Sequence, residues 1–276
     1  MKDILEKRAG IVRRIRAFFD SRSFVEVETP IRILAPAPEE HIDCPECCGG
    51  FLRASPELQM KKLLAAGMER IYQIGPCFRE GEKGSRHNPE FTMLEWYRAF
   101  ATYENIAADM KELLIELSAG RYEFSEIKVR QAYVRFAGWD PWLEWDADRF
   151  DYDMAVKIEP ALAEFKGAVF LRDYPVQASS LSKITSDHAE RWELYVDGIE
   201  IANCFTELCD SAEQRARFER SRANRAVLGE ADYPIDEDFL AIVDDMKSAA
   251  GVALGVDRLV MVLCGAKTIA EVRAGI

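Results

Sequence analysis

The sequence has 276 residues, of which 49% are apolar and 30% are charged, a composition typical of a globular protein and not of a disordered or fibrous one. Its 48 acidic residues exceed its 36 basic residues, and the net charge of −12 argues against a surface built to neutralise nucleic-acid phosphates. The start carries charges every few residues and lacks the continuous apolar stretch of a secretory signal, and no later stretch approaches a charge-free membrane span. Seven scattered cysteines fit a reducing cytoplasm better than a disulfide framework.

The first hundred residues predict helices and strands separated by proline, glycine and helix-capping residues. Apolar and polar residues alternate in the segment 24–30, which stops at Pro30. Proline cannot donate a backbone hydrogen bond, so it ends a strand or lies at a sheet edge. The sequence Ser55-Pro56-Glu57 has the residue types of a helix start, whereas 31–54 is rich in proline and glycine and predicts irregular turns. The predicted elements are helices at 3–20 and 55–67 and strands at 24–30, 70–78 and 91–99.

A polar loop, REGEKGSRHNPE, joins the last two of these strands and is too long for a tight hairpin turn. Arg79 and His87 offer cations to phosphates, and Phe91 offers a ring that can stack on a base. Glu95 and Tyr97 are two residues apart on the strand, so they share a face with Phe91. The hairpin is therefore a candidate nucleotide site, and the alternative is a surface hairpin with solvated charges.

The second half predicts helices at 103–118, 210–227 and 236–248, with a β-hairpin around Asp197-Gly198. The insert at 139–150 carries three tryptophans, which form either a protein-docking surface or the small core of an insertion. No repeat or linker divides the chain. We therefore expect residues 1–276 to form a single α+β domain, in which helices flank a largely antiparallel sheet.

A second candidate site lies on the predicted hairpin of residues 193–208. If its strands pair, Glu193 and Glu200 approach each other, and Glu207 shares a face with Asn203 and Phe205. Neighbouring carboxylates repel one another unless they bind Mg²⁺ or an ammonium group. The alternative is an exposed face with alternating solvated acids.

A third candidate is the glycine-bearing segment 251–258, which feeds an apolar helix. Glycines permit a ligand to approach the backbone, and Arg258 at the helix start is suited to bidentate contact with a phosphate. Helix capping or close packing explains the same glycines equally well.

Taken in order, these segments resemble the three motifs of class II aminoacyl-tRNA synthetases, at about 3–30, 70–99 and 251–264. RHNPEFTMLEWY and ELYVDGIEIANCFTEL resemble the lysyl branch of that class. Lysyl-tRNA synthetases carry an anticodon-binding domain before the first motif, for which a helix starting at residue 3 leaves no room. The chain thus resembles the elongation factor P β-lysine ligase family, which has alanine, as at Ala253, where lysyl-tRNA synthetases have glycine. One methyl group biases substrate choice by about 1–3 kcal/mol.

The resemblance implies an ATP- and Mg²⁺-dependent ligase with a class II synthetase-like fold. Its reaction would activate (R)-β-lysine, or lysine, as an aminoacyl-adenylate and transfer it to a lysine side chain of elongation factor P. It also implies a cytoplasmic homodimer that contacts itself through the first motif, with tRNA and membranes not expected as partners. The alternatives are a lysyl-tRNA synthetase paralogue that acylates tRNA or another acceptor, and a non-catalytic regulatory paralogue.

The resemblance also implies roles for single residues. Arg79 and Arg258 would be the catalytic residues, and Glu193 and Glu200 the metal ligands. The ATP-binding residues would be Arg79, Glu80, Glu82, His87, Asn88, Phe91, Glu200 and Arg258. The substrate-binding residues would be Ser55, Glu57, Glu95, Tyr97, Asn203, Phe205, Glu207 and Ala253.

Two features depart from the family pattern. The second motif usually reads Arg-Asn-Glu, with the glutamate on the adenine amino group, but here Arg79 is followed by Glu80-Gly81-Glu82, and either glutamate can substitute. In addition, the spacing of His41, Cys44, Cys47 and Cys48 resembles half a zinc site. No second pair follows at the required spacing, so a loop with buried or free thiols is the alternative.

Overall fold

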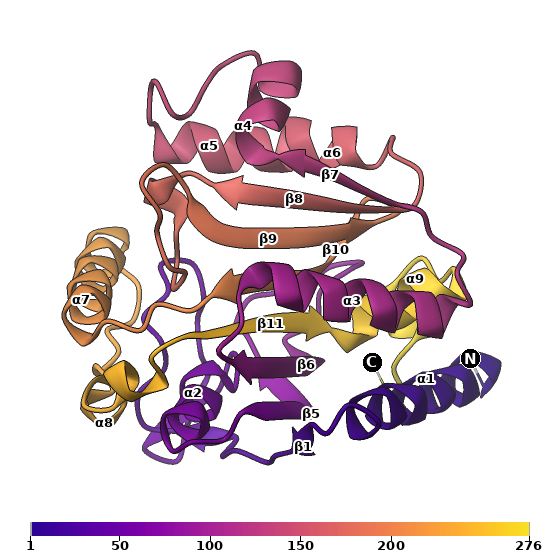
Figure 1. Ribbon diagram of the computed structural model, residues 1–276, viewed down its shortest axis with the longest axis horizontal. Coiled ribbons are helices and arrows are strands. Elements are labelled where there is room, and N and C mark those ends of the chain that lie inside the picture. Colours follow the sequence, from indigo (N-terminus) through magenta and orange to yellow (C-terminus); the bar gives the residue numbers. More distant parts are fainter. Residues whose placement is uncertain (1, 276) are drawn as a thin grey trace.

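The computed structural model describes residues 2–275, in which helices pack against one large mixed sheet (Figure 1). The eight strands in that part of the chain are ordered β1 (Val25–Glu26), β5 (Arg70–Phe78), β6 (Glu90–Ala99), β11 (Ala249–Gly255), β10 (Ile199–Thr206), β9 (Ala189–Val196), β8 (Ala168–Tyr174) and β7 (Phe124–Lys128). The outermost pairs are parallel and the others are antiparallel. The predicted α+β class with a largely antiparallel sheet is confirmed.

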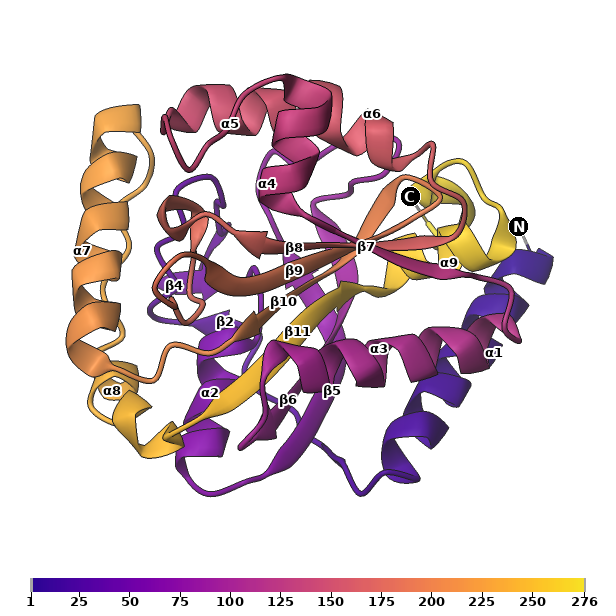
Figure 2. The same cartoon turned by 45° about the horizontal axis from the view of Figure 1, so that its top comes forward.

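The helices lie around this sheet (Figure 2). The α-helices are α1 (Lys2–Asp20), α2 (Glu57–Ala65), α3 (Tyr103–Ser118), α4 (Val129–Ala132), α5 (Ala147–Asp153), α6 (Glu159–Leu162), α7 (Ser211–Leu228), α8 (Glu237–Leu240) and α9 (Val256–Cys264). Short π-helical turns cover Tyr133–Ala137 and Met154–Ile158, and 3₁₀ turns cover Val176–Ala178, Val243–Met246 and Ile269–Glu271. In the part of the chain described, no helix is both long and apolar enough to cross a membrane.

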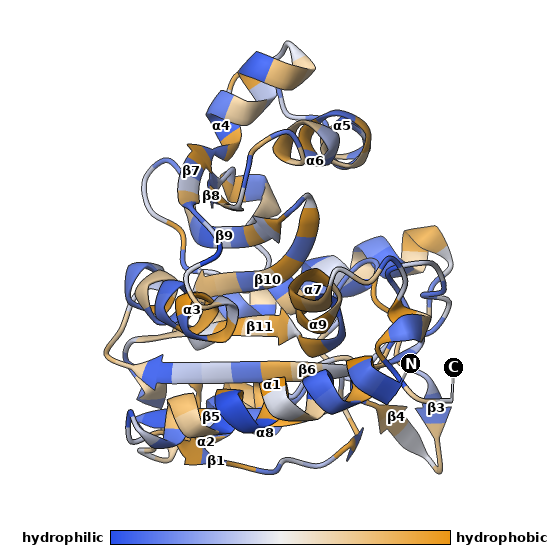
Figure 3. Ribbon diagram, turned by 90° about the vertical axis from the view of Figure 1, so that its right-hand side faces the viewer, coloured by the Kyte–Doolittle hydropathy of each residue, from blue (hydrophilic) through white to orange (hydrophobic). Residues whose placement is uncertain are grey.

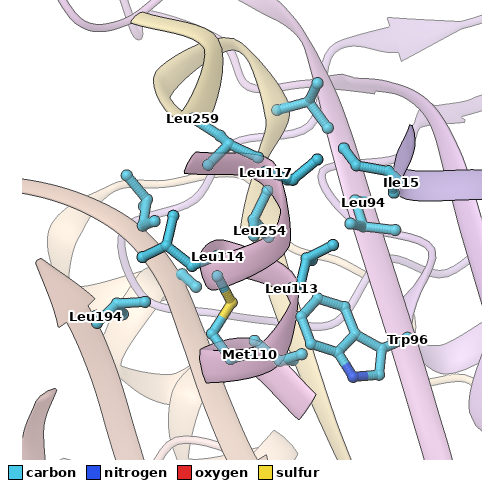
Figure 4. Packing of buried hydrophobic residues seen from close by; sticks show 14 of the residues in the cluster. Ile15, Leu94, Trp96, Met110, Leu113, Leu114, Leu117, Leu194, Leu254 and Leu259 are labelled. Carbon is cyan, nitrogen blue, oxygen red and sulfur yellow. The ribbon is translucent and has the colours of Figure 1, made fainter. Parts of the chain in front are cut away.

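The main core lies between one face of the sheet and the helices α1, α3 and α9. Side chains alternate along a strand, so Leu94 and Trp96 of β6 point into this core while Glu95 points to the opposite face. The same alternation places Leu254 of β11 in the core and Ala253 away from it. Figure 4 shows core residues Ile15, Leu94, Trp96, Met110, Leu113, Leu114, Leu117, Leu194, Leu254 and Leu259.

The helices α4, α5 and α6 form a separate layer over the β7–β8 end of the sheet (Figures 1 and 3). Trp139 is buried in the core of this layer, and its indole N–H donates to Asp153 at 2.8 Å. Trp142 and Trp145 are partly buried against the same core. Of the two readings of the tryptophans, these contacts support the small core of an insertion.

Three predicted elements differ from the structure. The strand expected at 24–30 pairs with β5 over two residues only and lies at the sheet edge, because Thr29 turns away to bond the side chain of Gln73. The helix expected at 236–248 is wrong: it is split into α8 and a 3₁₀ turn, and the backbone at Lys247 has a φ of 55°, which no helix continues through. The irregular segment 31–54 contains a small sheet of β2 (Arg32–Ile33), β4 (Gly50–Leu52) and β3 (Glu46–Cys47).

Candidate active site

A cavity of about 420 Å³ opens on the face of the sheet opposite the main core. It brings together the hairpin, the acidic strand and the glycine-bearing segment that the sequence singled out separately. The predicted residues that line it are Ser55, Glu57, Arg79, Glu82, His87, Asn88, Phe91, Glu95, Tyr97, Glu200, Asn203, Phe205, Glu207, Ala253 and Arg258. Glu80 and Glu193 are not among the lining residues.

Strand register places the floor of the cavity, formed by Glu95, Ala253 and Asn203, in one row across the sheet, and Glu193 continues this row beyond the cavity lining. Glu95 is the register partner of Ala253, which is the partner of Asn203, which in turn is the partner of Glu193. Partner residues in a sheet point to the same face, so these side chains lie next to one another. Segments more than a hundred residues apart in the sequence thus form one continuous surface.

Glu95 lies at one end of the cavity and is almost fully buried. Ser55 Oγ donates to its Oε1 at 2.5 Å, and Tyr97 Oη donates to its Oε2 at 2.9 Å. Burial, and after it the charge of Glu57, raises the pKa of Glu95 to about 8 despite these two donors. A cationic ligand beside Glu95 would reverse this shift.

Two further carboxylates flank Glu95 and share one buried cation. Lys61 Nζ lies 2.5 Å from Glu57 Oε1 and 2.5 Å from Glu207 Oε2. Burial raises the pKa of Glu207 to about 7, although Lys61 opposes the shift. This end of the cavity is therefore acidic and suited to ammonium groups.

Arg79 projects from the start of the hairpin loop, where its backbone N–H donates to Pro89 O at 2.9 Å. Its guanidinium lies 5.3 Å from the centre of the Phe91 ring and 3.4 Å from Glu82 Oε1. Glu80 is exposed and is not among the residues that line the cavity. Of the two glutamates that the sequence left open, Glu82 is the one at the cavity.

Arg258 lies in the first turn of α9 and contacts both the hairpin loop and the acidic strand β10. Its Nη1 donates to Glu200 Oε2 at 2.9 Å, and its Nη2 lies 2.5 Å from His87 Nε2. Burial, together with Arg258, lowers the pKa of His87, and an arginine can only donate, so Nε2 of a neutral imidazole accepts this bond. Arg79 and Arg258, each paired with one glutamate, define the basic end of the cavity.

Glu200 reaches the cavity because of an irregularity in β10. The register shifts between Glu200 and Ala202, so Glu200 stands opposite Tyr195 and shares a face with Glu193, its diagonal neighbour across the hairpin. Glu193 accepts from Arg191 at 2.6 Å and from Tyr195 at 2.8 Å. Burial and the charge of Glu193 raise the pKa of Glu200, while Arg258 opposes the shift. The register of the hairpin thus places the two carboxylates on one face, as diagonal neighbours.

Sequence reasoning missed several residues at this site. Arg191 lines the cavity and is two residues from Glu193 on the same strand, so alternation could have indicated it. Lys61 follows Glu57 by one helical turn, a spacing that permits an ion pair. Glu39 lines the cavity from the loop before β3, and no sequence signal pointed to it.

The cysteine-bearing loop is separate from this cavity. Cys44 is buried against Tyr233, whose hydroxyl accepts from the Cys44 backbone N–H at 2.8 Å, and burial raises the pKa of its thiol to about 11. A zinc ligand must be a thiolate, which this environment disfavours. Within residues 2–275, the structure has no group of three or more side chains placed to hold a metal ion.

Comparison with known proteins agrees with this geometry. A family model described as "tRNA synthetases class II (D, K and N)" matches residues 1–274. The elongation factor P–(R)-β-lysine ligases of Proteus mirabilis and Photorhabdus laumondii are each 39% identical to this chain, and that of Hamiltonella defensa is 36% identical. Each comparison covers 98% of this chain and 94% of the relative.

The structure has a mixed sheet that carries a cavity with an acidic and a basic end. Together with these matches, it defines the protein as a class II synthetase-type ligase that uses ATP. Within that class, the chain belongs to the elongation factor P–(R)-β-lysine ligase family.

Proposed function

We propose that this protein activates (R)-β-lysine with ATP as an aminoacyl-adenylate and transfers the acyl group to a lysine side chain of elongation factor P. The observation that carries the proposal is the polarity of one cavity, with Glu57, Glu95 and Glu207 at one end and Arg79 and Arg258 at the other. A diamino acid bound between these ends would have its ammonium groups on the carboxylates and its carboxylate directed at a nucleotide. The names of the relatives supply the amino acid and the acceptor.

In the first step the substrate carboxylate attacks the α-phosphorus of ATP, forms a new P–O bond and expels pyrophosphate. A carboxylate is already ionised at neutral pH, so this step needs no general base. Arg79 is suited to bridge the carboxylate and the α-phosphate and to stabilise the charge that develops between them. Its Nε is buried and has no hydrogen-bond partner among the described residues, which leaves a donor for the ligand.

We place the nucleotide at the basic end of the cavity. Phe91 and Arg258 would stack on opposite sides of the adenine, and Glu82 would accept from the adenine amino group. His87 and Asn88 line the same region and would contact the outer phosphates. Glu80, which the resemblance offered as an alternative to Glu82, has no place in this arrangement because it does not reach the cavity.

The amino acid occupies the acidic end. Glu57 and Glu95 would receive the amino group near the carboxylate, and Tyr97 and Glu207 the distal ammonium. Ser55 supports this site because it donates to Glu95. Asn203, Phe205 and Ala253 complete the walls of the pocket.

Mg²⁺ would be held by Glu193 and Glu200 together with oxygens of ATP. The donor set fits a hard cation, since both ligands are carboxylates and the charge of Glu193 raises the pKa of Glu200, a repulsion that a divalent ion relieves. When bound, the ion would neutralise phosphate charge. Arg191 and Arg258 hold the two carboxylates in place.

In the second step the neutral ε-amine of the acceptor lysine attacks the carbonyl carbon of the adenylate. A C–N bond forms, the mixed anhydride bond breaks, AMP leaves with its phosphate, and the amine loses one proton. Among the candidate residues none is placed as an obvious base, so we propose that the proton passes to solvent or to the departing phosphate. The net charge of −12 disfavours tRNA as the acceptor.

We also propose a homodimer formed through α1 and the edge strand β1. Beside this edge the side chains of Val25, Ile31 and Leu34 are apolar and exposed, as expected of a surface that a second copy covers. All seven cysteines are free, which suits a reducing compartment, and we propose that the enzyme works in the cytoplasm. Sedimentation equilibrium of the wild type and of Val25→Asp tests the dimer.

The deciding experiment is the intact mass of elongation factor P after incubation with the enzyme, ATP, Mg²⁺ and either (R)-β-lysine or L-lysine. The expected result is one lysyl-sized mass gain, formed faster with β-lysine and absent with Arg258→Ala. ATP consumption without a mass gain would point to tRNA or another acceptor. No ATP consumption at all would indicate a regulatory paralogue.

A further inference from the structure

Lys61 is an ammonium group with no access to solvent. Its side chain is 0% exposed, and it does not line the cavity. Transfer of a lone ammonium from water into a protein interior is costly, so a buried lysine needs compensating partners. Lys61 has two, Glu57 and Glu207, each 2.5 Å from its Nζ.

The two partners come from distant parts of the chain. Glu57 lies in the first turn of α2, four residues before Lys61, whereas Glu207 directly follows β10. Both carboxylates line the cavity, and the ammonium lies behind them. The pair of contacts therefore connects α2 to the end of β10 and fixes the two carboxylates relative to each other.

Other titratable groups face this triad from each neighbouring element. Glu95 and Tyr97 approach from β6, and the charge of Glu57 contributes to raising the pKa of both. Glu39 approaches from the loop before β3: burial and Glu57 raise its pKa, whereas Arg79, Arg191 and Lys61 lower it. Cys209 follows Glu207, and burial raises the pKa of its thiol to about 11. Within the triad, Lys61 is the cation in direct contact with both acids.

We propose that Lys61 is a positioning residue for the amino acid, which holds Glu57 and Glu207 at a fixed separation and keeps both able to receive the two ammonium groups of the substrate. This inference rests on the proposed function, which places those groups on Glu57 and Glu207. One ammonium shared by two carboxylates leaves the triad with a net negative charge, which the substrate neutralises. Without Lys61, two buried carboxylates repel each other and retain protons to higher pH.

The variant Lys61→Met tests this, because methionine replaces the ammonium with an apolar chain of similar length. The matched control is Lys62→Met, the next residue of the same helix, whose ammonium pairs with Asp236 at 2.7 Å outside the cavity. Calorimetric titration with (R)-β-lysine alone, at several values between pH 6 and pH 9, measures the amino-acid site. ATP–pyrophosphate exchange gives the KM for ATP separately.

We expect Lys61→Met to bind (R)-β-lysine at pH 7 about tenfold more weakly or worse, and to recover part of this loss toward pH 9. Its KM for ATP changes by less than about twofold, and Lys62→Met matches the wild type throughout. Wild-type affinity and pH profile in Lys61→Met would overturn the inference, as would an equal loss for ATP, which indicates a general structural role. If the wild type itself neither binds the diamino acid nor supports exchange with it, the proposed function fails first.

If Lys61→Met does not fold, the double variant Glu57→Gln with Lys61→Met removes the cation together with one of its acids. This variant leaves no repelling pair and is expected to fold, while its affinity for (R)-β-lysine is expected to fall below that of Glu57→Gln alone, which keeps Lys61 on Glu207. Equal affinity of these two variants would contradict the positioning role.

Discussion

The ring of Tyr97 lies directly against the backbone of Gly251, so that a β-carbon placed on Gly251 would fall 2.1 Å from the ring. The two residues are register partners on β6 and β11. Glycine is needed here for close approach and not for an unusual backbone angle. The contact keeps the phenol in the cavity, where its hydroxyl donates to Glu95.

The variant Gly251→Ala should displace Tyr97 and disturb Glu95. We expect the KM for the amino acid to rise about tenfold, and overpacking to lower the free energy of unfolding by about 1–3 kcal/mol. Exchange kinetics and urea denaturation measure the two effects. Gly10→Ala in α1 is the control, since the nearest atom to its new β-carbon lies 3.9 Å away. An unchanged KM in Gly251→Ala would refute the role of the contact.

The affinity for the diamino acid should depend on pH in a defined direction. The pKa of Glu95 is raised to about 8, so its carboxyl is mostly protonated in the free enzyme near pH 7, and Glu207, whose pKa is raised to about 7, loses its charge below that pH. Ammonium groups bind the ionised forms, and the KM for the amino acid should therefore fall as the pH rises from 6 to 9. A pH-independent KM would be inconsistent with these carboxylates as its ligands.

The raised pKa of Glu95 also predicts that the ligand-free protein loses stability as the pH rises. An unfolded glutamate has a pKa of about 4.3, so the folded state binds more protons at Glu95 than the unfolded state between that value and about 8. Glu95→Gln removes this penalty and should stabilise the free protein at pH 8 by on the order of 5 kcal/mol, with no gain at pH 4. Denaturant titrations at the two pH values measure this. A lower free energy of unfolding for Glu95→Gln than for the wild type at both pH 4 and pH 8 would contradict this prediction.

Ala253 stands between Glu95 and Asn203 in the cavity floor. Ala253→Gly enlarges the pocket by one methyl group and should change the ratio of kcat/KM between L-lysine and (R)-β-lysine, in favour of L-lysine, by about 10- to 200-fold. Ala250→Gly on the same strand faces the core and controls for the weakening of the strand. Equal ratios in the two variants would exclude a role in selection.

Asp257 connects the two proposed walls of the adenine site. Its carboxylate lies 2.5 Å from Arg8 Nη1 and accepts from the backbone N–H of Thr92, the neighbour of Phe91, while Asp257 itself precedes Arg258. Asp257→Asn leaves Arg8 without its charged partner, so we expect a loss of about 3–5 kcal/mol of stability and a larger rise in KM for ATP than for the amino acid. Glu271→Gln, exposed on the C-terminal segment, is the control. Thermal denaturation measures the loss of stability, and ATP–pyrophosphate exchange measures the two KM values. An equal rise in the KM for ATP and for the amino acid would contradict the prediction.

The face of the sheet on which a residue lies can be predicted from the sequence where the strand is regular, because side chains then alternate strictly between the two faces. Glu95 and Tyr97 were placed on one face from their spacing, and the structure places both in the cavity. Alternation alone would have put Glu200 and Asn203, three residues apart, on opposite faces. The register shift at Ile201 brings both to the cavity, and no local sequence signal marks that shift.

Other features depend on contacts between distant segments. The segment 236–248 has apolar residues at helical spacing, namely Phe239, Leu240, Val243 and Met246. It nevertheless breaks into two turns, and Ser211 bonds Asp244 in the second of them. In the sequence, Lys61, whose ammonium contacts Glu57 and Glu207, does not differ from the other lysine of the predicted helix. Its burial depends on β10, which lies about 140 residues later. Tertiary packing determined these features, and local propensity did not.

The central position of β11 has a consequence for synthesis of the protein. Among residues 2–275 it is the last strand along the chain, yet it pairs between β6 and β10 and joins the two halves of the sheet. Until residues 249–255 have left the ribosome, the two halves of the sheet cannot close on each other through this strand. The nascent chain therefore exposes the unpaired edges of β6 and β10 until β11 has been made, which makes it a natural client for chaperones at that stage.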